Sequence, residues 1–513
     1  MNNAETLQNL RQKIVHNAER HSDDIWLISP ETGVEISFKQ AAEQVQAIAE
    51  NLKALGLQEG DRVAIASQNC IGCCLTFLGT VFGGFVAVPL NLVAGKKTMG
   101  YIIDHSESKL IFVADHCAGD INDALQGIGR EVMRVQLQYE AGPNWDEVAL
   151  NLKNEYTWTN LQGSTIGLLM YTSGTTGNPK GVMLSHANLL AAGRFISSGH
   201  AISQNDRALC VLPIYHINGL CVSLIGTAVS SSALVMPYRF SSSMFWEIIN
   251  KYKCSWFSAV PTQFAYILNQ AETMEDLSHL RFARSASAPL APDIHRRFEE
   301  RFKVPIIETM GLTETGSQIL TNPMPPALRK IGSPGQAFGN EIMISNENQE
   351  SVDSGITGEI LVRGANVMQG YFKQPEETAK TITPKGWLRT GDLGYMDKDG
   401  FIFVSGRIKE LIIKGGENIA PREIDETLLE HEAILEAAAF AVQCPDYGER
   451  VEACIKFKDN KTVPLEALYV HCNDRLGSFK SPDIIHVLKD LPKGPSGKVQ
   501  RLKLFKLIYS ELP

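Results

Sequence analysis

The sequence predicts an α/β protein with a large N-terminal domain of layered sheets and helices and a small α+β C-terminal domain. Three observations support this prediction. The chain has 513 residues, more than one hydrophobic core normally accommodates, so two or more domains are expected. Short apolar runs typical of buried strands alternate with amphipathic helical stretches through most of the chain. Near residue 405 this alternation gives way to a mixed order of elements.

The N-terminal region supplies the alternating elements in order. Leu7, Leu10 and Ile14 lie on one stripe of a first helix. A second helical pattern covers residues 37–55, and a third covers residues 243–252. The strand-like runs are residues 62–67, 110–114, 208–212 and 233–236.

The longest apolar run, residues 72–95, is interrupted by Gly83, Gly84 and Pro89. A membrane span needs roughly 20 apolar residues with few breakers, so we expect a buried helix, a glycine stop and a core strand here. The helix starts at a cluster of three cysteines, Cys70, Cys73 and Cys74, with Asn69 as its expected N-cap. No second closely spaced pair of ligands accompanies this cluster, which favours buried thiols over a zinc site.

The last hundred or so residues form the small domain. A strand at residues 401–404 ends in a short glycine-containing turn, so we divide the chain into an N-terminal domain, residues 1–405, and a C-terminal domain, residues 406–513. The elements expected after the turn are strands at 411–413, 437–441 and 453–457 and helices at 421–431 and 465–475.

Composition narrows the function. A formal net charge of −9 argues against a sequence-independent nucleic-acid binder, which needs a basic face. The first 24 residues lack the charged, apolar and small-residue segments of an export signal, so the cytoplasm is the expected compartment.

The segment from Tyr171 to Gly181 carries the sharpest chemical signal. A strand at residues 166–171 runs into Thr172, Ser173, Gly174, Thr175, Thr176, Gly177 and, after two more residues, Lys180. Glycines let backbone N–H groups converge on an anion, hydroxyls add donors and the lysine adds a positive charge, which is chemistry suited to cradling phosphates. The common NTPase loop ends in Gly-Lys-Ser/Thr, which is absent here. A flexible surface turn is the alternative interpretation.

Two further segments have weaker signals. In residues 310–314, Thr313 and Glu314 place a hydroxyl beside a carboxylate, a suitable ligand pair for the Mg²⁺ of a nucleotide. Such pairs are also common at helix starts. In residues 387–392, Asp392 ends a turn and could accept two hydrogen bonds from a ribose, although a solvated turn would look the same.

In this order and spacing, the segments resemble the adenylate-forming superfamily, which includes acyl- and aryl-CoA synthetases, peptide-synthetase adenylation domains and firefly luciferases. The resemblance covers nearly the whole chain. It also rests on residues 212–219, on residues 358–360 with Gly364, Gly370 and Tyr371, on residues 406–409 and on residues 494–498.

The resemblance implies roles for these residues. The hydroxyls of the 172–176 segment and Lys180 would hold the β- and γ-phosphates, with Glu314 on Mg²⁺. Asp392, assisted by Arg407, would bind the ribose, and Met310 and Gly311 would border the adenine. Lys498 would reach the substrate carboxylate and the α-phosphate from a mobile C-terminal domain. A bridging ammonium would offset the repulsion between two anions; without the resemblance, a solvated tail lysine is the simpler reading.

The resemblance also implies CoA as acceptor. Gly415 and Gly416 are similar to the segment that lines the pantetheine tunnel of CoA ligases after rotation at a hinge, here Lys409. His216 matches a residue near the acyl pocket, although a lone histidine could equally belong to the core.

The acyl pocket is expected to be mostly apolar, which suits an aryl or short-to-medium acid better than a highly charged one. The family's glycine-richer loop is replaced here by residues 285–290, so Ser287 and Ala288 should narrow the site. Arg284 precedes this loop and either pairs with a second carboxylate of the acid or points away from the pocket. The candidate pocket walls are Tyr215, His216, Trp256, Val260, Phe264 and Ser317.

Three functions follow, in order of preference. The first is an ATP-dependent acid:CoA ligase that forms an acyl-adenylate and then a thioester. The second delivers the same adenylate to the phosphopantetheine arm of a separate carrier protein. The third, from another class, is a nucleotide-binding sensor without catalysis. The expected ligands are therefore ATP, Mg²⁺, a carboxylic acid and CoA.

Overall fold

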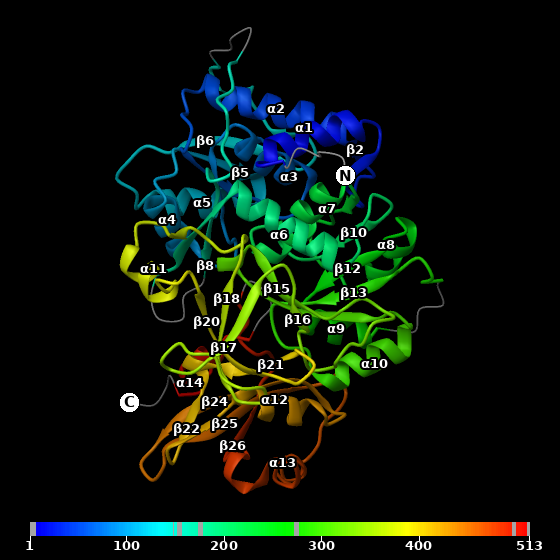
Figure 1. Ribbon diagram of the computed structural model, residues 1–513, viewed down its shortest axis with the longest axis vertical. Coiled ribbons are helices and arrows are strands. Elements are labelled where there is room, and N and C mark those ends of the chain that lie inside the picture. The colour runs from blue at the N-terminus through cyan, green and yellow to red at the C-terminus, as the bar shows by residue number, and fades with distance from the viewer. Residues whose placement is uncertain are drawn as a thin grey trace.

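The computed structural model describes residues 7–146, 148–150, 156–172, 178–270, 276–494 and 499–509. Two large sheets, a smaller one and a C-terminal sheet organise these residues (Figure 1). The fold is the expected α/β architecture, a large N-terminal domain of mixed sheets followed by a small C-terminal domain.

The first large sheet has eight strands in the order β19-β9-β8-β4-β3-β5-β6-β7, mostly parallel in its centre. Its strands are β3 (Arg62–Ala66), β4 (Val86–Pro89), β5 (Leu110–Ala114), β6 (Met133–Gln138), β7 (Gly142–Pro143), β8 (Ile166–Thr172), β9 (Lys180–Ser185) and β19 (Gly370–Tyr371). Helices α4 (Lys96–His105) and α5 (Ala118–Leu125) cover one face through a cluster of buried side chains.

The second large sheet has nine strands in the order β16-β15-β14-β13-β12-β10-β11-β1-β2. They are β1 (Ile25–Ile28), β2 (Glu35–Ser37), β10 (Arg207–Cys210), β11 (Ala233–Val235), β12 (Trp256–Ala259), β13 (Phe282–Ser285), β14 (Ile306–Leu312), β15 (Ser317–Thr321) and β16 (Gln336–Ala337). Its outer face packs on α8 (Phe245–Lys251), α9 (Pro261–Leu268) and α10 (Pro292–Phe302).

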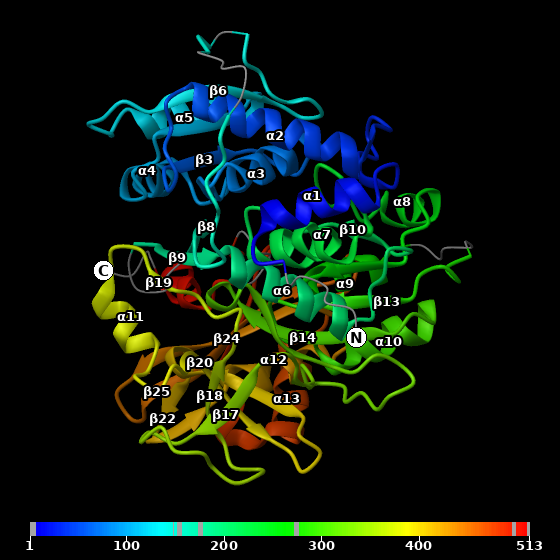
Figure 2. The same ribbon diagram turned by 45° about the horizontal axis from the view of Figure 1, so that its top comes forward.

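The main core lies between the two large sheets (Figure 2). It is built from α1 (Leu10–Arg20), α2 (Phe38–Ala54), α3 (Ile71–Phe82), α6 (His186–Gly199), α7 (Gly226–Ser230) and the π-helix η2 (Asn218–Ile225). Helix α2 begins with a capping box in which Ser37 and Gln40 satisfy each other's backbone N–H groups. None of the helices in the described ranges has the length and apolar character that crossing a bilayer requires.

The apolar run at residues 72–95 folds as expected. All of α3 is buried, Gly83 follows its last residue, and β4 comes next. The N-cap differs from the prediction, because it is Cys70, whose sulfur accepts a hydrogen bond from the Cys73 N–H at 3.3 Å. Asn69 instead donates to the Leu212 carbonyl at 2.9 Å and so joins α3 to the second sheet. Cys70, Cys73 and Cys74 are buried, free thiols.

A four-stranded sheet leads to the C-terminal domain. It contains β17 (Glu341–Ser345), β18 (Gly358–Arg363), β20 (Leu388–Met396) and β21 (Ile402–Arg407), with α11 (Pro375–Thr381) between β19 and β20. The expected strand at 401–404 therefore runs three residues further, through Ser405 and Gly406, because its partner β20 continues the ladder to Arg407. The proposed boundary at 405/406 falls inside this strand.

The C-terminal sheet has the order β23-β22-β25-β24, with β26 beside β25. Its strands are β22 (Ile412–Lys414), β23 (Glu417–Ile419), β24 (Ile434–Cys444), β25 (Gly448–Phe457) and β26 (Ile484–Val487). Helices α12 (Pro421–Leu429) and α13 (Leu465–Lys480) cover one face, and α14 (Leu504–Tyr509) packs on the other. The short helical turns of the chain are η1 (Asp115–Cys117), η3 (Thr313–Thr315), η4 (Ile408–Glu410) and η5 (Arg501–Lys503).

Candidate active site

The phosphate-cradling segment connects two paired strands. β8 and β9 are antiparallel, and Thr172 at the end of β8 lies opposite Lys180 at the start of β9. The two strands that flank the segment therefore lie side by side and run in opposite directions, as the flanks of an anion-wrapping loop must. Ser173, Gly174, Thr175, Thr176 and Gly177 lie outside the described residues.

Lys180 is held at the mouth of this turn by two side chains. Its ammonium forms an ion pair with Glu377 of α11 and lies 5.0 Å from the centre of the Tyr371 ring. Hydrogen bonds from Lys180 and Lys380 lower the pKa of Glu377 to about 2. The lysine is thus positioned by an acid that a phosphate oxygen would have to displace.

Glu314 lies beside the same tyrosine. It belongs to the short turn η3 between β14 and β15, and the Tyr371 hydroxyl donates to its Oε1 at 2.8 Å. The Met368 N–H donates to the Glu314 carbonyl, also at 2.8 Å. Tyr371 therefore links the phosphate-loop lysine to the predicted metal ligand, although the two are far apart in sequence. Thr313 precedes Glu314 in this turn.

The β14–β15 hairpin that carries Glu314 depends on Gly311. A Cβ at this position would lie 1.7 Å from the carbonyl oxygen of Ser317, a backbone atom that cannot move aside. Met310, next to this glycine, is half-buried at the edge of the main core. Only glycine allows this close approach, so the sequence around Glu314 is constrained by backbone packing.

Asp392 and Arg407 face each other across β20 and β21. They are paired residues in the ladder, and the Arg407 Nε donates to Asp392 Oδ1 at 2.7 Å. The carboxylate of Asp392 is the main cause that raises the pKa of Arg407, and the carboxylates of Glu410 and Glu314 add to it.

The segment that contains His216 is connected to Ser287 through one buried amide, that of Asn218. His216 precedes the π-helix η2, a helix type that is rare and frequent at functional sites. The first residue of η2, Asn218, donates from Nδ2 to the Ser287 hydroxyl at 3.1 Å. Ser287 has a φ of +74°, which serine seldom adopts, so the loop that includes Ala288 is held in a constrained turn.

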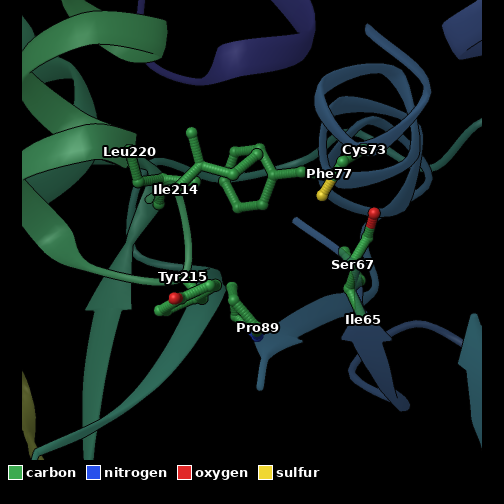
Figure 3. Close-up of a pocket in the computed structure, with 8 residues that line it drawn as sticks. All are labelled: Ile65, Ser67, Cys73, Phe77, Pro89, Ile214, Tyr215 and Leu220. Carbon is green, nitrogen blue, oxygen red and sulfur yellow. The ribbon is translucent and has the colours of Figure 1, made fainter. Parts of the chain in front are cut away.

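The other expected pocket walls do not form one surface. Val260 is buried at the N-cap of α9. Trp256 stacks on Phe282 in the core between the sheets, whereas Phe264 packs on Phe298 beneath the opposite face. Tyr215 borders a small cavity (Figure 3), whose walls are Ile65, Ser67, Cys73, Phe77, Pro89, Ile214, Tyr215 and Leu220.

In the C-terminal domain, Gly415 and Gly416 form the two-residue turn between β22 and β23, both with positive φ as such turns require. Lys409 lies in η4, immediately after β21. Lys498 lies outside the described residues. The segment that carries it is closed at its base by a bridge between Lys493 and Val499.

This base is attached to the N-terminal domain. The Lys493 ammonium donates to Glu436 at 2.6 Å and to the hydroxyl of Tyr266 in α9 at 3.1 Å. Helix α9 begins next to Val260, so Lys493 is anchored to the helix that adjoins the expected acyl pocket.

Two contacts of the candidate site were not expected from the sequence. They are the ion pair of Glu377 with Lys180 and the hydrogen bond of Tyr371 to Glu314. Gly370 and Tyr371 were part of the recognised motif, which was the available signal for the tyrosine. Glu377 lies on an exposed helix among other charges, and nothing in the local pattern distinguishes it.

Comparison with known proteins shows the family to which the chain is similar. The model of the AMP-binding enzyme family matches residues 14–372, and that of the AMP-binding enzyme C-terminal domain matches residues 423–498. A sulfoacetate–CoA ligase of Cupriavidus necator is 41% identical over 98% of this chain and 98% of its own length. An oxalate–CoA ligase of Saccharomyces cerevisiae is 31% identical over 94% of both chains.

Solved structures give the same result. The ATP-bound MatB of Rhodopseudomonas palustris superposes with a TM-score of 0.90, at 27% identity and with 98% of this chain and 99% of that chain covered. The o-succinylbenzoate CoA synthetase MenE of Bacillus subtilis, in complex with OSB-AMP, has a TM-score of 0.84 at 29% identity, with 96% and 97% covered.

The apo form of the same MatB has a TM-score of only 0.79 at equal coverage.

Proposed function

The chain belongs to the AMP-binding enzyme family and is an AMP-forming acid–CoA ligase, and we propose that its ATP lies across Lys180, Glu314 and the Asp392–Arg407 pair. The observation that carries this proposal is the contact of Tyr371 with both Lys180 and Glu314, which brings the phosphate turn and the metal-ligand turn together. The ribose hydroxyls would donate hydrogen bonds to the Asp392 carboxylate, which is only 6% exposed and is oriented by Arg407.

The reaction has two steps. A carboxylate oxygen of the acid attacks the α-phosphorus of ATP, and the bond to pyrophosphate breaks. The CoA thiolate then attacks the acyl carbonyl, and AMP leaves with the bridging oxygen. Lys180 neutralises the charge that grows on pyrophosphate, after exchanging Glu377 for a phosphate oxygen. Lys498 is proposed, from the family resemblance, to draw the two anions together.

Magnesium fits the donors at this point. Glu314 supplies a carboxylate held in place by Tyr371, and Thr313 supplies a neighbouring hydroxyl, in keeping with the preference of Mg²⁺ for oxygen ligands plus substrate phosphates. The ion would screen the charge of the triphosphate. Glu314 and Thr313 orient this region whether or not they bind the ion directly.

We propose that the N-terminal and C-terminal domains act as two bodies that rotate at Lys409, which follows the end of β21. The polar contacts between the domains include Tyr266 with Glu436, at 3.2 Å, and Arg422 with the Val404 carbonyl, at 2.6 Å. Leu435 adds an apolar contact with the N-terminal domain, and relative motion is the usual expectation for domains that are joined in this way. Rotation would withdraw the Lys498 segment and bring the Gly415–Gly416 turn to the acyl-adenylate, where it would line the path of the CoA thiol.

The acid is proposed to be short and to carry a second anionic group. Two relatives that match nearly the whole chain act, by name, on such acids: sulfoacetate bears a sulfonate, and oxalate bears a second carboxylate. This differs from the weakly charged acid that the apolar walls suggested.

The ten cysteines are all free thiols, which suits a reducing compartment such as the cytoplasm.

The test is a panel of carboxylic acids scored by pyrophosphate release with ATP and Mg²⁺. We expect release with short dianionic acids and, on adding CoA, a thioester and AMP. Lys498→Ala should lower the rate of the first step by on the order of 10²–10³-fold, the cost of losing one transition-state charge contact. Formation of ADP, or a thioester on a holo-carrier protein but not on CoA, would contradict the proposal.

A further inference from the structure

Arg284 is the largest buried cation near the expected acyl pocket. It lies on β13, between β12 and β14, and its side chain is 1% exposed. Burial lowers the pKa of its guanidinium to about 9, so the group remains charged near neutral pH. A charge in such a position is costly unless an opposite charge accompanies it.

Every acceptor that Arg284 contacts among the described residues is neutral, and two of its three hydrogen bonds are long. Its Nη1 donates to Ser258 Oγ at 3.1 Å and to Asn218 Oδ1 at 3.3 Å, and its Nη2 donates to Gln318 Oε1 at 3.4 Å. Its Nε finds no hydrogen-bond partner in the described part of the chain. Within the described ranges no carboxylate forms an ion pair with it, and none opposes the effect of burial on its pKa.

The charged groups around Arg284 do not supply the missing anion. At the C-cap of α6, His200 is completely buried, and burial together with the charge of Arg284 lowers its pKa to about 3, so it is neutral. Arg281, three residues earlier in the chain, is already paired with Asp206 at 2.5 Å. The environment therefore has a positive charge that nothing in the described part of the protein balances.

Two residues that Arg284 contacts connect it to the residues that are expected to border the acyl pocket. Asn218 accepts from Arg284 with its Oδ1 and donates to the Ser287 hydroxyl with its Nδ2, so one amide separates the guanidinium from the pocket loop. Gln318 directly follows Ser317, a candidate wall with a φ of +114°. Asn218 thus connects Arg284 to Ser287, and Gln318 connects it to the adjacent Ser317. Both serines have a positive φ and border the expected site of the acid.

We propose that Arg284 binds the second anionic group of the acid and thereby selects short dianionic acids. This inference rests on the proposed function, since it uses the same acyl pocket. Oxygens of a sulfonate or carboxylate one or two carbons from the reacting carboxylate would replace the neutral amide oxygens, because hydrogen bonds between ions are shorter and roughly twice as strong. A monocarboxylic acid would leave the guanidinium unpaired and would bind weakly.

The experiment compares kcat/KM for malonate and sulfoacetate with kcat/KM for acetate and propionate, using pyrophosphate release. We expect the wild type to favour the dianions by about 100-fold or more, because an unpaired buried charge costs 2–5 kcal/mol. Arg284→Gln should lower kcat/KM for both dianions by about 100-fold, mainly through KM, and change that for acetate less than about threefold. Arg284→Lys should restore part of the loss, which shows that charge matters.

Control variants and the wild type keep the inference falsifiable. Arg281→Gln removes a neighbouring arginine whose partner is internal, and it should leave the ratio between acids unchanged. An equal loss for all four acids in Arg284→Gln, or a wild type that prefers monocarboxylates, would overturn the inference, and the second result needs no folded variant. A loss for only one dianion would show whether sulfonate or carboxylate is the group bound. No pyrophosphate with any acid would refute the proposed function instead.

Discussion

Replacing Tyr371 by phenylalanine removes one hydroxyl and keeps the ring 5.0 Å from the Lys180 ammonium. The hydroxyl donates to Glu314 Oε1 at 2.8 Å inside a mostly buried setting. A hydrogen bond to a charged group contributes roughly 1.5–3 kcal/mol, and each 1.4 kcal/mol is a factor of ten. If the hydroxyl orients Glu314 for the MgATP complex, kcat/KM for MgATP should fall by about 10- to 100-fold.

The assay is pyrophosphate release at fixed ATP and acid with increasing MgCl₂. The variant should need a higher Mg²⁺ concentration for half-maximal rate, because Glu314 is no longer held. Tyr101→Phe, in which the ring stacks on His105 away from Glu314, is the matched control and should behave as wild type. A Tyr371→Phe enzyme with unchanged kcat/KM and an unchanged Mg²⁺ requirement would refute the role given to this hydrogen bond.

Two other substitutions test the β14–β15 hairpin. Gly311→Ala places a methyl group against the Ser317 carbonyl, so urea unfolding should show that the free energy of unfolding falls by about 1–3 kcal/mol or more. ATP binding should weaken as well. A variant as stable as the wild type would mean that the close approach is wrong. Met310→Tyr supplies a planar ring beside the expected adenine and should lower the KM for ATP, whereas an unchanged KM would reject adenine stacking at this position.

The fold could be predicted largely from short-range patterns. Helix α3, its glycine stop and β4 follow from apolar residues and breakers that are adjacent in the chain. The strand expected at residues 166–171 is likewise local, and it is found as β8. These features depend on neighbours, so one sequence is enough to reveal them. The end of β21 was misplaced because its length is set by its partner β20, a tertiary effect.

The contacts inside the site could not be predicted in the same way. Tyr371 contacts Glu314 across 57 positions of the sequence, and it contacts Lys180 because the distant strands β19 and β9 pair in one sheet. Trp256 and Phe264 were expected on one pocket, but they pack in separate cores because they lie on different elements with opposite faces. Whether Arg284 points toward the pocket depends on Asn218 and Gln318, which come from a π-helix and a distant strand.

The most direct test of the account uses an acid labelled with ¹⁸O in both carboxylate oxygens, together with ATP, Mg²⁺ and CoA. If the carboxylate attacks the α-phosphorus and CoA then displaces AMP, mass spectrometry should find one ¹⁸O atom in AMP and none in pyrophosphate. Unlabelled AMP, or label in inorganic phosphate formed together with ADP, would contradict an acyl-adenylate intermediate.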